Sequence, residues 1–271
     1  MKAATADLKP GHFVLAFARI SLRDTFAYKV DLFVKLAGYP ARLLMGYFLW
    51  KTLFEHKVIA GTDFRSVFTY YMIVYLLTQM FPFVRMARSI REEIYSGQLS
   101  VYLARGYPHT SIWLSRFLAA SMSYLLLVSP MAIPLILIFG ELHCQPSTLL
   151  ASLILIVLGT LIRGQMWYLM GISSFFTEEN MGTLRVYDLI ERFLSGAILP
   201  LFLFPTWLIN TAQYLPFSNM VFVPVDLLVR EHAPNEAWTA VGVAVYWSLA
   251  LGFVTRLVFQ AGWKRFTAHG I

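Results

Sequence analysis

The sequence is short of two things on which soluble and secreted domains depend. Only one of its 271 residues is a cysteine, Cys144, so no disulfide bond can form within the chain. Charged residues make up 14% of the chain, whereas an average soluble domain carries roughly 25%. These shortages exclude a disulfide-stabilised scaffold, and they leave too few charges to coat a protein that faces water on all sides.

Familiar catalytic and nucleotide-binding motifs are missing as well. The pattern G-x-x-x-x-G-K-[ST] does not occur, so the chain cannot bind ATP through a P-loop. H-E-x-x-H and G-x-S-x-G are absent too, and the six histidines are scattered. The adjacent acidic pairs, Glu92-Glu93 and Glu178-Glu179, point in different directions along a helix and make poor catalytic dyads. We therefore expect no catalytic centre, metal site or cofactor in this chain.

The sequence is rich in long apolar segments. Hydrophobic residues make up 58% of the chain, with 22 Phe, 14 Tyr and 7 Trp, and the mean hydropathy is +0.62. A membrane-spanning helix needs about 20 mostly apolar residues. Six regions qualify, namely 32–54, 67–86, 112–139, 148–176, 187–209 and 238–259. We expect an all-α polytopic membrane protein in which 1–271 form a single domain, since no internal repeat or soluble domain is visible.

Prolines interrupt several of these apolar regions. Two lie in the third predicted span and two in the fifth, and they should kink these helices. They are Pro130, Pro134, Pro200 and Pro205. A further apolar stretch, 211–229, is broken by Pro216 and Pro224 and is too interrupted for an ordinary span.

The distribution of Lys and Arg sets the orientation, because cytoplasmic loops carry an excess of them. With a cytoplasmic N-terminus, 14 of the 22 basic residues fall on inner segments and 4 on outer ones. The remaining four lie within or at the edges of spans, namely Lys35, Arg42, Arg163 and Arg256. We therefore expect both termini in the cytoplasm and 211–229 on the outer face, as a re-entrant or surface-lying pair of short helices. The net charge of +7 then reflects topology and not nucleic-acid binding.

The segment before the first span, 1–30, has an amphipathic pattern. On a helix, three basic and three apolar side chains of this segment fall on neighbouring arcs. The basic set is His12, Arg19 and Arg23, and the apolar set is Phe13, Phe17 and Ile20. The pattern favours a helix lying on the inner membrane surface. A solvated leader is the alternative.

The inner loop 87–111 contains a short charged helix between the second and third spans. Its apolar side chains are Ile90, Ile94 and Tyr95, and its charged ones include Arg88, Arg91, Glu92 and Glu93. Ser96-Gly97 should end this helix, because Gly suits the left-handed conformation of a helix cap. The shape suits docking of a cytoplasmic partner, and an ordinary solvated connector is the alternative.

Two arginines, Arg42 and Arg163, lie near the middle of predicted spans, where each costs about 2.5–3.5 kcal/mol on insertion scales. Either they face an aqueous pathway or an anionic substrate group, or backbone carbonyls, Tyr or Gln79 satisfy them within the bundle. We expect all 15 Asp+Glu in loops or at span ends, which argues against a proton-driven transporter.

A polar stripe runs along the second predicted span. It consists of Tyr70, Tyr71, Tyr75, Thr78 and Gln79. Such a stripe more often holds helices together than lines a pore. The candidates for lining a translocation pathway are Arg42, Tyr70, Tyr75, Gln79 and Arg163.

Four segments, in this order and spacing, carry a resemblance to a known family. They are 47–54 (YFLWKTLF); 90–99 (IREEIYSGQL) followed by 102–108 (YLARGYP), similar to an I-R-x-G-x-L…L-x-x-P loop; 215–217 (LPF) with 223–225 (VPV), like an L-P-F…P element; and 263–270, a basic, aromatic tail ending in Gly. Over nearly its whole length the chain resembles the permeases of ABC type 2 exporters.

This resemblance implies a permease that pairs with a second copy or a sister permease and works with separate ATPase subunits, which bind ATP and Mg²⁺. By implication 1–30 is an interface helix, 88–99 the coupling helix that docks on the ATPase, and 211–229 the outer re-entrant element. The coupling residues are Arg88, Arg91, Glu92, Glu93, Ile94, Tyr95 and Gly97, and the outer element contains Pro216, Phe217 and Pro224. Glu92 and Glu93 are expected to meet basic residues of the ATPase, and Ile94 and Tyr95 to fill its groove.

The expected setting is the plasma (inner) membrane of a prokaryote, where the chain contacts the lipid bilayer and moves a substrate that no motif specifies. Two other functions remain as alternatives. One is an importer-type permease for a small metabolite, and the other is a membrane-embedded enzyme or assembly factor. Co-purification with an ATPase that carries Walker motifs distinguishes the transporters from the third class.

Overall fold

The computed structural model describes residues 29–56, 62–80, 83–104, 109–143, 145–177 and 181–268. Within these ranges the chain is helical and has no strand, which confirms the all-α prediction. Several predicted features lie outside the described residues: most of the N-terminal segment 1–30, the acidic pair 178–179, and 105–108 of the inner loop.

The helices follow one another with short connections. In chain order they are α2 (Lys29–Glu55), α3 (Phe64–Thr78), α4 (Phe83–Tyr95), α5 (Gln98–Ala104), α6 (His109–Phe139), α7 (Pro146–Ile172), α8 (Met181–Leu194), α9 (Thr206–Ala212), α10 (Phe222–Val229) and α11 (Pro234–Ala268). Single 3-10 turns lie at Ser173–Phe175, Leu201–Leu203 and Ser218–Met220.

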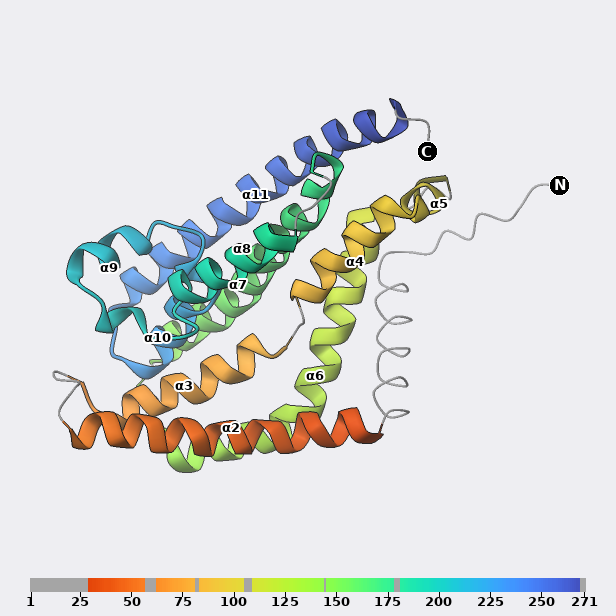
Figure 1. Cartoon of the computed structure of the whole chain (residues 1–271). Coiled ribbons are helices and arrows are strands. Elements are labelled where there is room, and N and C mark those ends of the chain that lie inside the picture. The colour runs from red at the N-terminus through yellow and green to blue at the C-terminus, as the bar shows by residue number, and fades with distance from the viewer. Residues whose placement is uncertain are drawn as a thin grey trace.

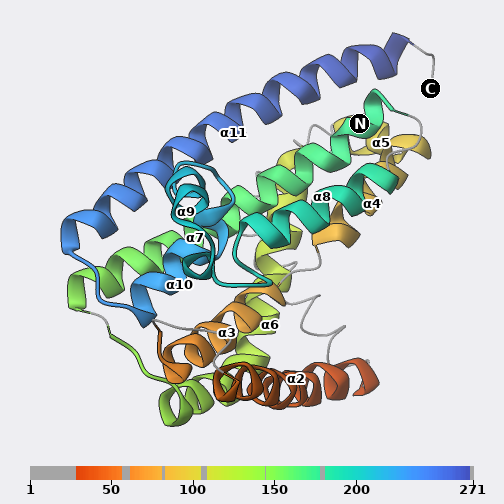
Figure 2. The same cartoon turned by 60° about the vertical axis from the view of Figure 1, so that its left-hand side comes forward.

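Helix α7 occupies the centre of the bundle. The longest helix, α11, runs beside it, and α4 and α10 pack against other parts of it. Helix α2 lies at the edge, where it packs on α3 and α6 (Figures 1 and 2). The two figures show α2 and α11 at opposite edges of the molecule, with α7 between them.

Among the residues that the structure describes, four stretches are long and apolar enough to cross a membrane, namely Phe64–Tyr95, His109–Phe139, Pro146–Phe175 and Pro234–Arg265. They coincide with the second, third, fourth and sixth predicted spans, although the first of them is divided into α3 and α4. The predicted first span corresponds to α2, a single helix of 27 residues that is not among these four. The protein is therefore a multi-pass membrane protein, and the count of six spans stays a prediction.

The prediction of one kinked helix over 187–209 is wrong. Helix α8 ends at Leu194, and Gly196 then takes a positive φ of 78°. Glycine adopts this conformation without steric strain because it has no Cβ. Pro200 and Pro205 follow, and neither has an N–H to continue a helix. The apolar stretch is therefore divided into α8, the 3-10 turn at Leu201–Leu203, and α9.

The stretch 211–229 forms short pieces, and from Pro216 onward most of its residues are buried in the bundle. Helix α10 has only eight residues and packs on α7 and α3. The Ser152 hydroxyl of α7 donates to the Pro224 carbonyl at 2.6 Å. Pro216 and Pro224 are buried and Phe217 is half-buried. Short helices were expected here, while their location at the outer membrane face stays a prediction.

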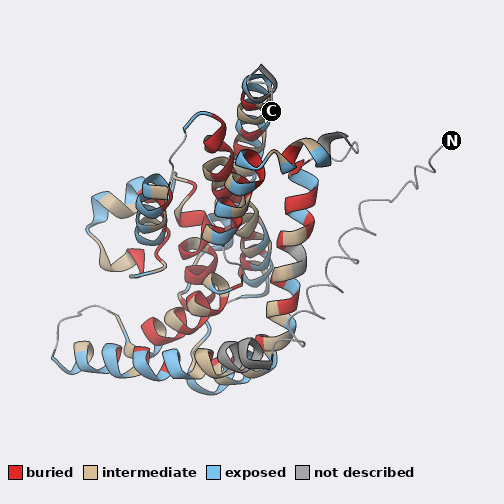
Figure 3. Ribbon diagram, turned by 45° about the vertical axis from the view of Figure 1, so that its right-hand side comes forward, coloured by how far each residue is buried: buried red, intermediate tan, exposed pale blue. Residues whose placement is uncertain are grey.

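The outer surface of the bundle is rich in apolar side chains, as a membrane protein requires because its outside faces lipid. Over residues 37–55 of α2, where burial is described, the buried face is narrow and is marked by Tyr39, Leu43 and Trp50, whereas Leu44 and Phe48 are more than half exposed. Figure 3 shows the same contrast, with exposed residues along α2 and buried residues along the central helices.

Candidate functional site

Helix α4 has one face in the core and one at the surface. Ile90 and Ile94 are buried, and Ile90 packs so tightly on α7 that a Cβ at Gly171 would lie 2.9 Å from the isoleucine Cβ. The opposite face exposes Arg85, Arg88, Glu92 and Tyr95 at helical spacing. The structure therefore starts the predicted coupling helix at Phe83 rather than Arg88 and anchors it on α7.

The predicted end of this helix is confirmed. Gly97 has a positive φ of 73°, and the backbone N–H groups of Ser96 and Gly97 donate to the carbonyls of Glu92 and Ile94. Two of the last carbonyls of α4 are thereby satisfied, and the chain turns sharply into α5.

Glu93 is at the centre of a buried charge network. His109 Nε2 lies 2.9 Å from its Oε2, the Trp113 indole donates to the same oxygen at 3.1 Å, and Arg116 donates to Oε1 at 3.0 Å. His109 in turn lies 2.8 Å from the Tyr168 hydroxyl through Nδ1. The network ties α4 to α6 and α7, and we call it the Glu93 network.

This placement corrects two parts of the coupling prediction. Glu93 is only 7% exposed and its carboxylate already has three partners, so it does not offer its charge to another protein. Ile94 is buried as well and cannot fill a groove outside the chain. Successive helix residues differ by 100° in direction, so Glu92 stays at the surface while Glu93 points inward.

The other coupling candidates lie at or near the surface. Arg88 and Glu92 are exposed, and Arg91 is half-buried with its guanidinium 4.7 Å from the centre of the Tyr95 ring. The Tyr95 hydroxyl donates to the Thr177 carbonyl at 2.7 Å. Tyr95 is thus exposed yet fixed in position by a contact with the segment that follows α7.

Arg163 forms a buried ion pair. Its Nε lies 2.9 Å from Oε1 of Glu191 in α8, and the Trp167 indole donates to Glu191 Oε2 at 3.0 Å. Arg163 is 7% exposed, Glu191 is fully buried, and the Phe83 ring lies 4.5 Å from the guanidinium. Of the two alternatives for Arg163, the structure favours satisfaction within the bundle over an open pathway.

The partner of Arg163 was missed by the sequence argument, which expected every acidic residue in a loop or at a span end. Glu191 lies within α8 and faces α7 in the core. The signal that pointed to it was Arg163 itself, because a buried Arg requires a counter-charge at matching depth. His109 was missed in the same way, since it was counted only among scattered histidines.

Arg42, in contrast, is exposed on α2. Its guanidinium lies 5.6 Å from the centre of the Tyr75 ring, and the Tyr71 hydroxyl donates to its backbone carbonyl at 3.2 Å. Tyr39 stacks on Tyr75 at a centroid distance of 5.5 Å. Arg42 is therefore one edge of an aromatic cluster formed by α2 and α3.

The predicted polar stripe does not lie on one face. Tyr70 points into the core, where its hydroxyl donates to the Gly196 carbonyl at 2.8 Å. Tyr75 points toward Arg42, and Gln79 is exposed at the end of α3. Gln79 follows Tyr75 by four residues and therefore lies on the same face of α3. The structure keeps Arg42 and Tyr75 together and separates Tyr70 and Arg163 from them.

Long apolar helices, an exposed amphipathic helix at one end of the bundle and the network that anchors it define a polytopic membrane protein with a fixed surface helix. The family model of the ABC-2 family transporter protein matches residues 41–270, so the chain belongs to that family. Members are the membrane permeases of transporters that normally work with an ATPase partner, and the chain is not itself an ATPase. Among curated proteins and among solved structures, none matches this chain.

Proposed function

We propose that this chain is the membrane-spanning subunit of an ATP-driven exporter, and that conformational changes of a separate ATPase are transmitted to it through α4. The observation that carries this proposal is the exposed face of α4, formed by Arg85, Arg88, Glu92 and Tyr95. A surface with both positive and negative charges and one aromatic side chain suits a protein partner better than lipid, because charged side chains are costly in hydrocarbon.

The Glu93 network supports a role for α4 in transmission. Breaking a buried ion pair costs about 3–5 kcal/mol, so α4 cannot move away from α6 and α7 without moving them. A displacement imposed on the exposed face of α4 is therefore passed to α6 through Arg116 and to α7 through Tyr168. In this scheme the ATPase binds ATP and Mg²⁺, and α4 of this chain transmits the movement of the ATPase to the spanning helices.

The translocation pathway is proposed at the edge formed by α2 and α3, where a second permease copy or a sister permease would face it. Support comes from the exposed apolar side chains of α2 and from Arg42, an exposed charge held by Tyr75. The exporter would lie in the plasma membrane of a prokaryote with both termini in the cytoplasm. An importer-type permease is the second candidate, and it would use the same docking helix.

The docking surface is tested by reversing its charges. The double variant Arg88→Glu/Glu92→Arg changes two exposed residues of α4 and should reduce co-purification of the ATPase by about tenfold or more, because the loss of two charge-assisted contacts costs at least 1.4 kcal/mol. ATP hydrolysis by the complex should fall in parallel. The matched control is Lys51→Glu/Glu55→Arg, which swaps an exposed pair on α2.

The outcomes separate the alternatives. If the α4 variant keeps the wild-type amount of ATPase while folding normally, α4 is not the docking helix. If the wild-type chain is purified as a stable protein that never binds an ATPase, the transporter assignment itself fails and a membrane enzyme or assembly factor takes its place. Loss of the ATPase from both double variants would show a general effect of charge reversal.

A further inference from the structure

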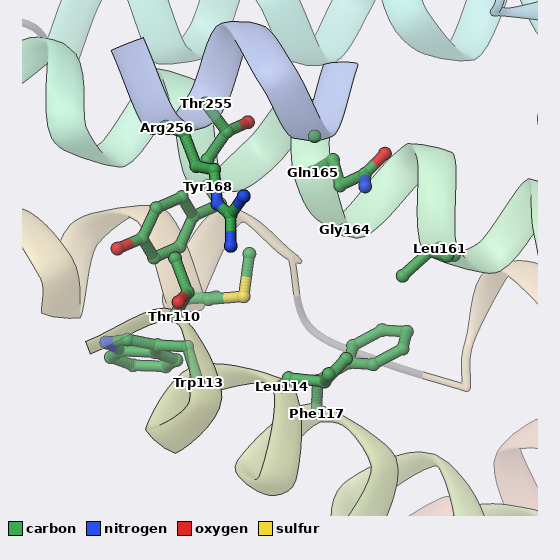
Figure 4. A pocket seen from close by; sticks show the side chains of 12 residues that line it. Thr110, Trp113, Leu114, Phe117, Leu161, Gly164, Gln165, Tyr168, Thr255 and Arg256 are labelled. Carbon is green, nitrogen blue, oxygen red and sulfur yellow. The ribbon is translucent and has the colours of Figure 1, made fainter. Parts of the chain in front are cut away.

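A pocket of about 220 Å³ lies between α6, α7 and α11 (Figure 4). Its inner walls are apolar and include Phe117, Leu161 and Gly164. Pockets that enclose drug-sized ligands have volumes of roughly 300–1,000 Å³, so this one has room for part of a molecule, such as one acyl chain.

The rim of the pocket faces the membrane. Leu114 lines the pocket and is 44% exposed, and Phe253 and Leu257 flank it on α11 with at least half of their surface exposed. All three side chains are apolar, and they belong to helices that are long enough to span the bilayer. An occupant therefore enters from the lipid phase and not from water.

Polar groups without partners lie in the same pocket. Thr255 is only 6% exposed, and its hydroxyl forms no hydrogen bond within the described part of the chain. The side-chain oxygen of Gln165 is also buried without a partner, although its amide nitrogen donates to the Ser248 carbonyl. Buried polar atoms normally have partners, so these two indicate that a ligand or water completes the site.

Arg256 adds a positive charge. It forms no hydrogen bond or ion pair with any described residue, and Figure 4 shows its guanidinium extending from α11 into the space between the three helices. An unpaired Arg at membrane depth is expensive, which makes an anionic partner the expected solution. Charge complementarity thus selects an anionic ligand.

The depth of Arg256 in the membrane further restricts the class of ligand. Trp263, Lys264 and Arg265 mark an interface near the end of α11, and Arg256 precedes Trp263 by seven residues, or about 10 Å at 1.5 Å per residue. Long Arg side chains extend from such a depth toward the headgroups. Thr110, in the first turn of α6, lines the pocket at the same end.

We propose that this pocket binds an anionic phospholipid of the adjacent leaflet, with the phosphate at Arg256 and one acyl chain between Phe117, Leu161 and Gly164. A phospholipid fits the rim, the charge and the apolar walls of the site, because it arrives from the bilayer, carries its negative charge at the interface and has an apolar chain below it. That the leaflet is the cytoplasmic one rests on the proposed function and its orientation. The lipid chemistry does not depend on that orientation.

The test uses the purified chain in detergent, without any ATPase, so that its failure is separate from that of the proposed function. Dioleoyl-phosphatidylglycerol and dioleoyl-phosphatidylcholine are added in equal amounts, and bound lipid is counted by native mass spectrometry. We expect phosphatidylglycerol to bind about tenfold more tightly. Arg256→Gln should bring it down to the level of phosphatidylcholine. Glycerol phosphate, which has no acyl chain, should not compete.

A second variant tests the acyl-chain position. A Cβ at Gly164 meets only ordinary contacts at 3.9–4.0 Å from Phe83 and Phe117, so Gly164→Leu should fold while filling the pocket and weakening both lipids about tenfold. The matched controls are Arg185→Gln, on an exposed residue of α8, and Gly242→Leu, where a Cβ on α11 meets nothing within 4 Å. Equal binding of the two lipids, or equal losses in the controls, would overturn the proposal, as would competition by glycerol phosphate.

Discussion

Helices α2 and α7 are both 27 residues long, and each carries one arginine in its interior. The surroundings of the two guanidinium groups differ. On α7 the guanidinium of Arg163 is buried and paired with Glu191. On α2 the guanidinium of Arg42 is exposed and touches only the face of Tyr75 among the contacts described above. An arginine on a central helix therefore needs a counter-charge from a neighbouring helix. An arginine on a peripheral helix can instead contact solvent, a ligand or a partner.

Two glycines, one on each helix, differ in the space around them. A Cβ at Gly159 of α7 would lie 2.3 Å from the carbonyl oxygen of Asn219, so glycine is required for the close approach of the chain before α10. A Cβ at Gly38 of α2 meets nothing within 4 Å, whereas a Cβ at Gly46, farther along α2, would lie 2.1 Å from the Tyr71 ring. The space beside α2 at Gly38 is therefore open, while α7 at Gly159 is tightly packed.

The largest expected effect comes from breaking the ion pair in the centre. Arg163→Leu leaves Glu191 buried without a counter-charge, and we expect a loss of about 3–5 kcal/mol in stability. Thermal unfolding of the purified protein in detergent measures it. The double variant Arg163→Leu/Glu191→Leu removes both charges and should recover most of the loss.

The matched control for that experiment is Arg42→Leu. Because Arg42 is exposed, its replacement should change the free energy of unfolding by less than about 1 kcal/mol. If Arg163→Leu is as stable as Arg42→Leu, the distinction between the two helices is wrong.

A smaller effect is expected from adding one methyl group to each helix. Gly159→Ala forces Asn219 away from α7 and should cost about 1–3 kcal/mol, as overpacked cores do. Gly38→Ala should instead stabilise by about 0.5–1 kcal/mol, since alanine has the better helix propensity. Unfolding midpoints of the two variants, measured side by side, should shift in opposite directions, and a shared direction would contradict the packing described here.

Access of water to α2 can be compared at two neighbouring positions of this helix. After Cys144 is replaced by Ser, we expect Arg42→Cys to react with a water-soluble thiol reagent about tenfold faster than Leu44→Cys, because Leu44 points away from the buried face of α2 toward lipid. Mass spectrometry of the labelled protein gives both rates. Equal rates would remove the support that Arg42 gives to a pathway at α2.

The smallest effect concerns the loop after α10, the helix that packs on α7. A hydrogen bond from His232 to Asp226, with Nε2 and Oδ2 3.0 Å apart, raises the pKa of His232 above its ordinary value of about 6.5. A raised folded-state pKa gives stability that is complete below pH 6.5 and is lost as the pH rises through the folded-state pKa. Unfolding midpoints of the wild type should therefore decline over that range.

The variant His232→Gln isolates this contribution. It has no titrating ring, so it should lose the part of the decline that begins near pH 6.5 while its other pH dependence remains. Identical pH profiles for the wild type and His232→Gln would show that the contact with Asp226 does not contribute to stability.

Much of the fold could be predicted from the sequence, because apolar length and helix caps are local signals. Four of the six predicted spans coincide with long apolar helices, and the stop at Gly97 is confirmed by its positive φ. The break within 187–209 could not be read from hydropathy, since a continuous helix and a broken one have the same apolar composition. What decides it is the conformation of Gly196, which depends on its neighbours in space.

The candidate site was predicted only in part. The amphipathic pattern identified α4 as a surface helix, but it placed Glu93 on the wrong side. The rotation of α4 is fixed by His109 and Arg116, which come from a different helix, and no pattern within 83–95 contains that information. The same reason explains Glu191, because ion pairs between helices are recognised only when the helices are brought together.

The pair of Arg163 and Glu191 also has a consequence for how the chain is made. The two residues are 28 positions apart, so Arg163 is synthesised first, and at roughly 5–20 residues per second its partner follows about 1–6 seconds later. During that interval α7 carries an unneutralised arginine, which opposes its release into lipid by about 2.5–3.5 kcal/mol. We therefore expect the insertion machinery to retain α7 until α8 emerges, so that the two helices enter the bilayer as a neutral unit.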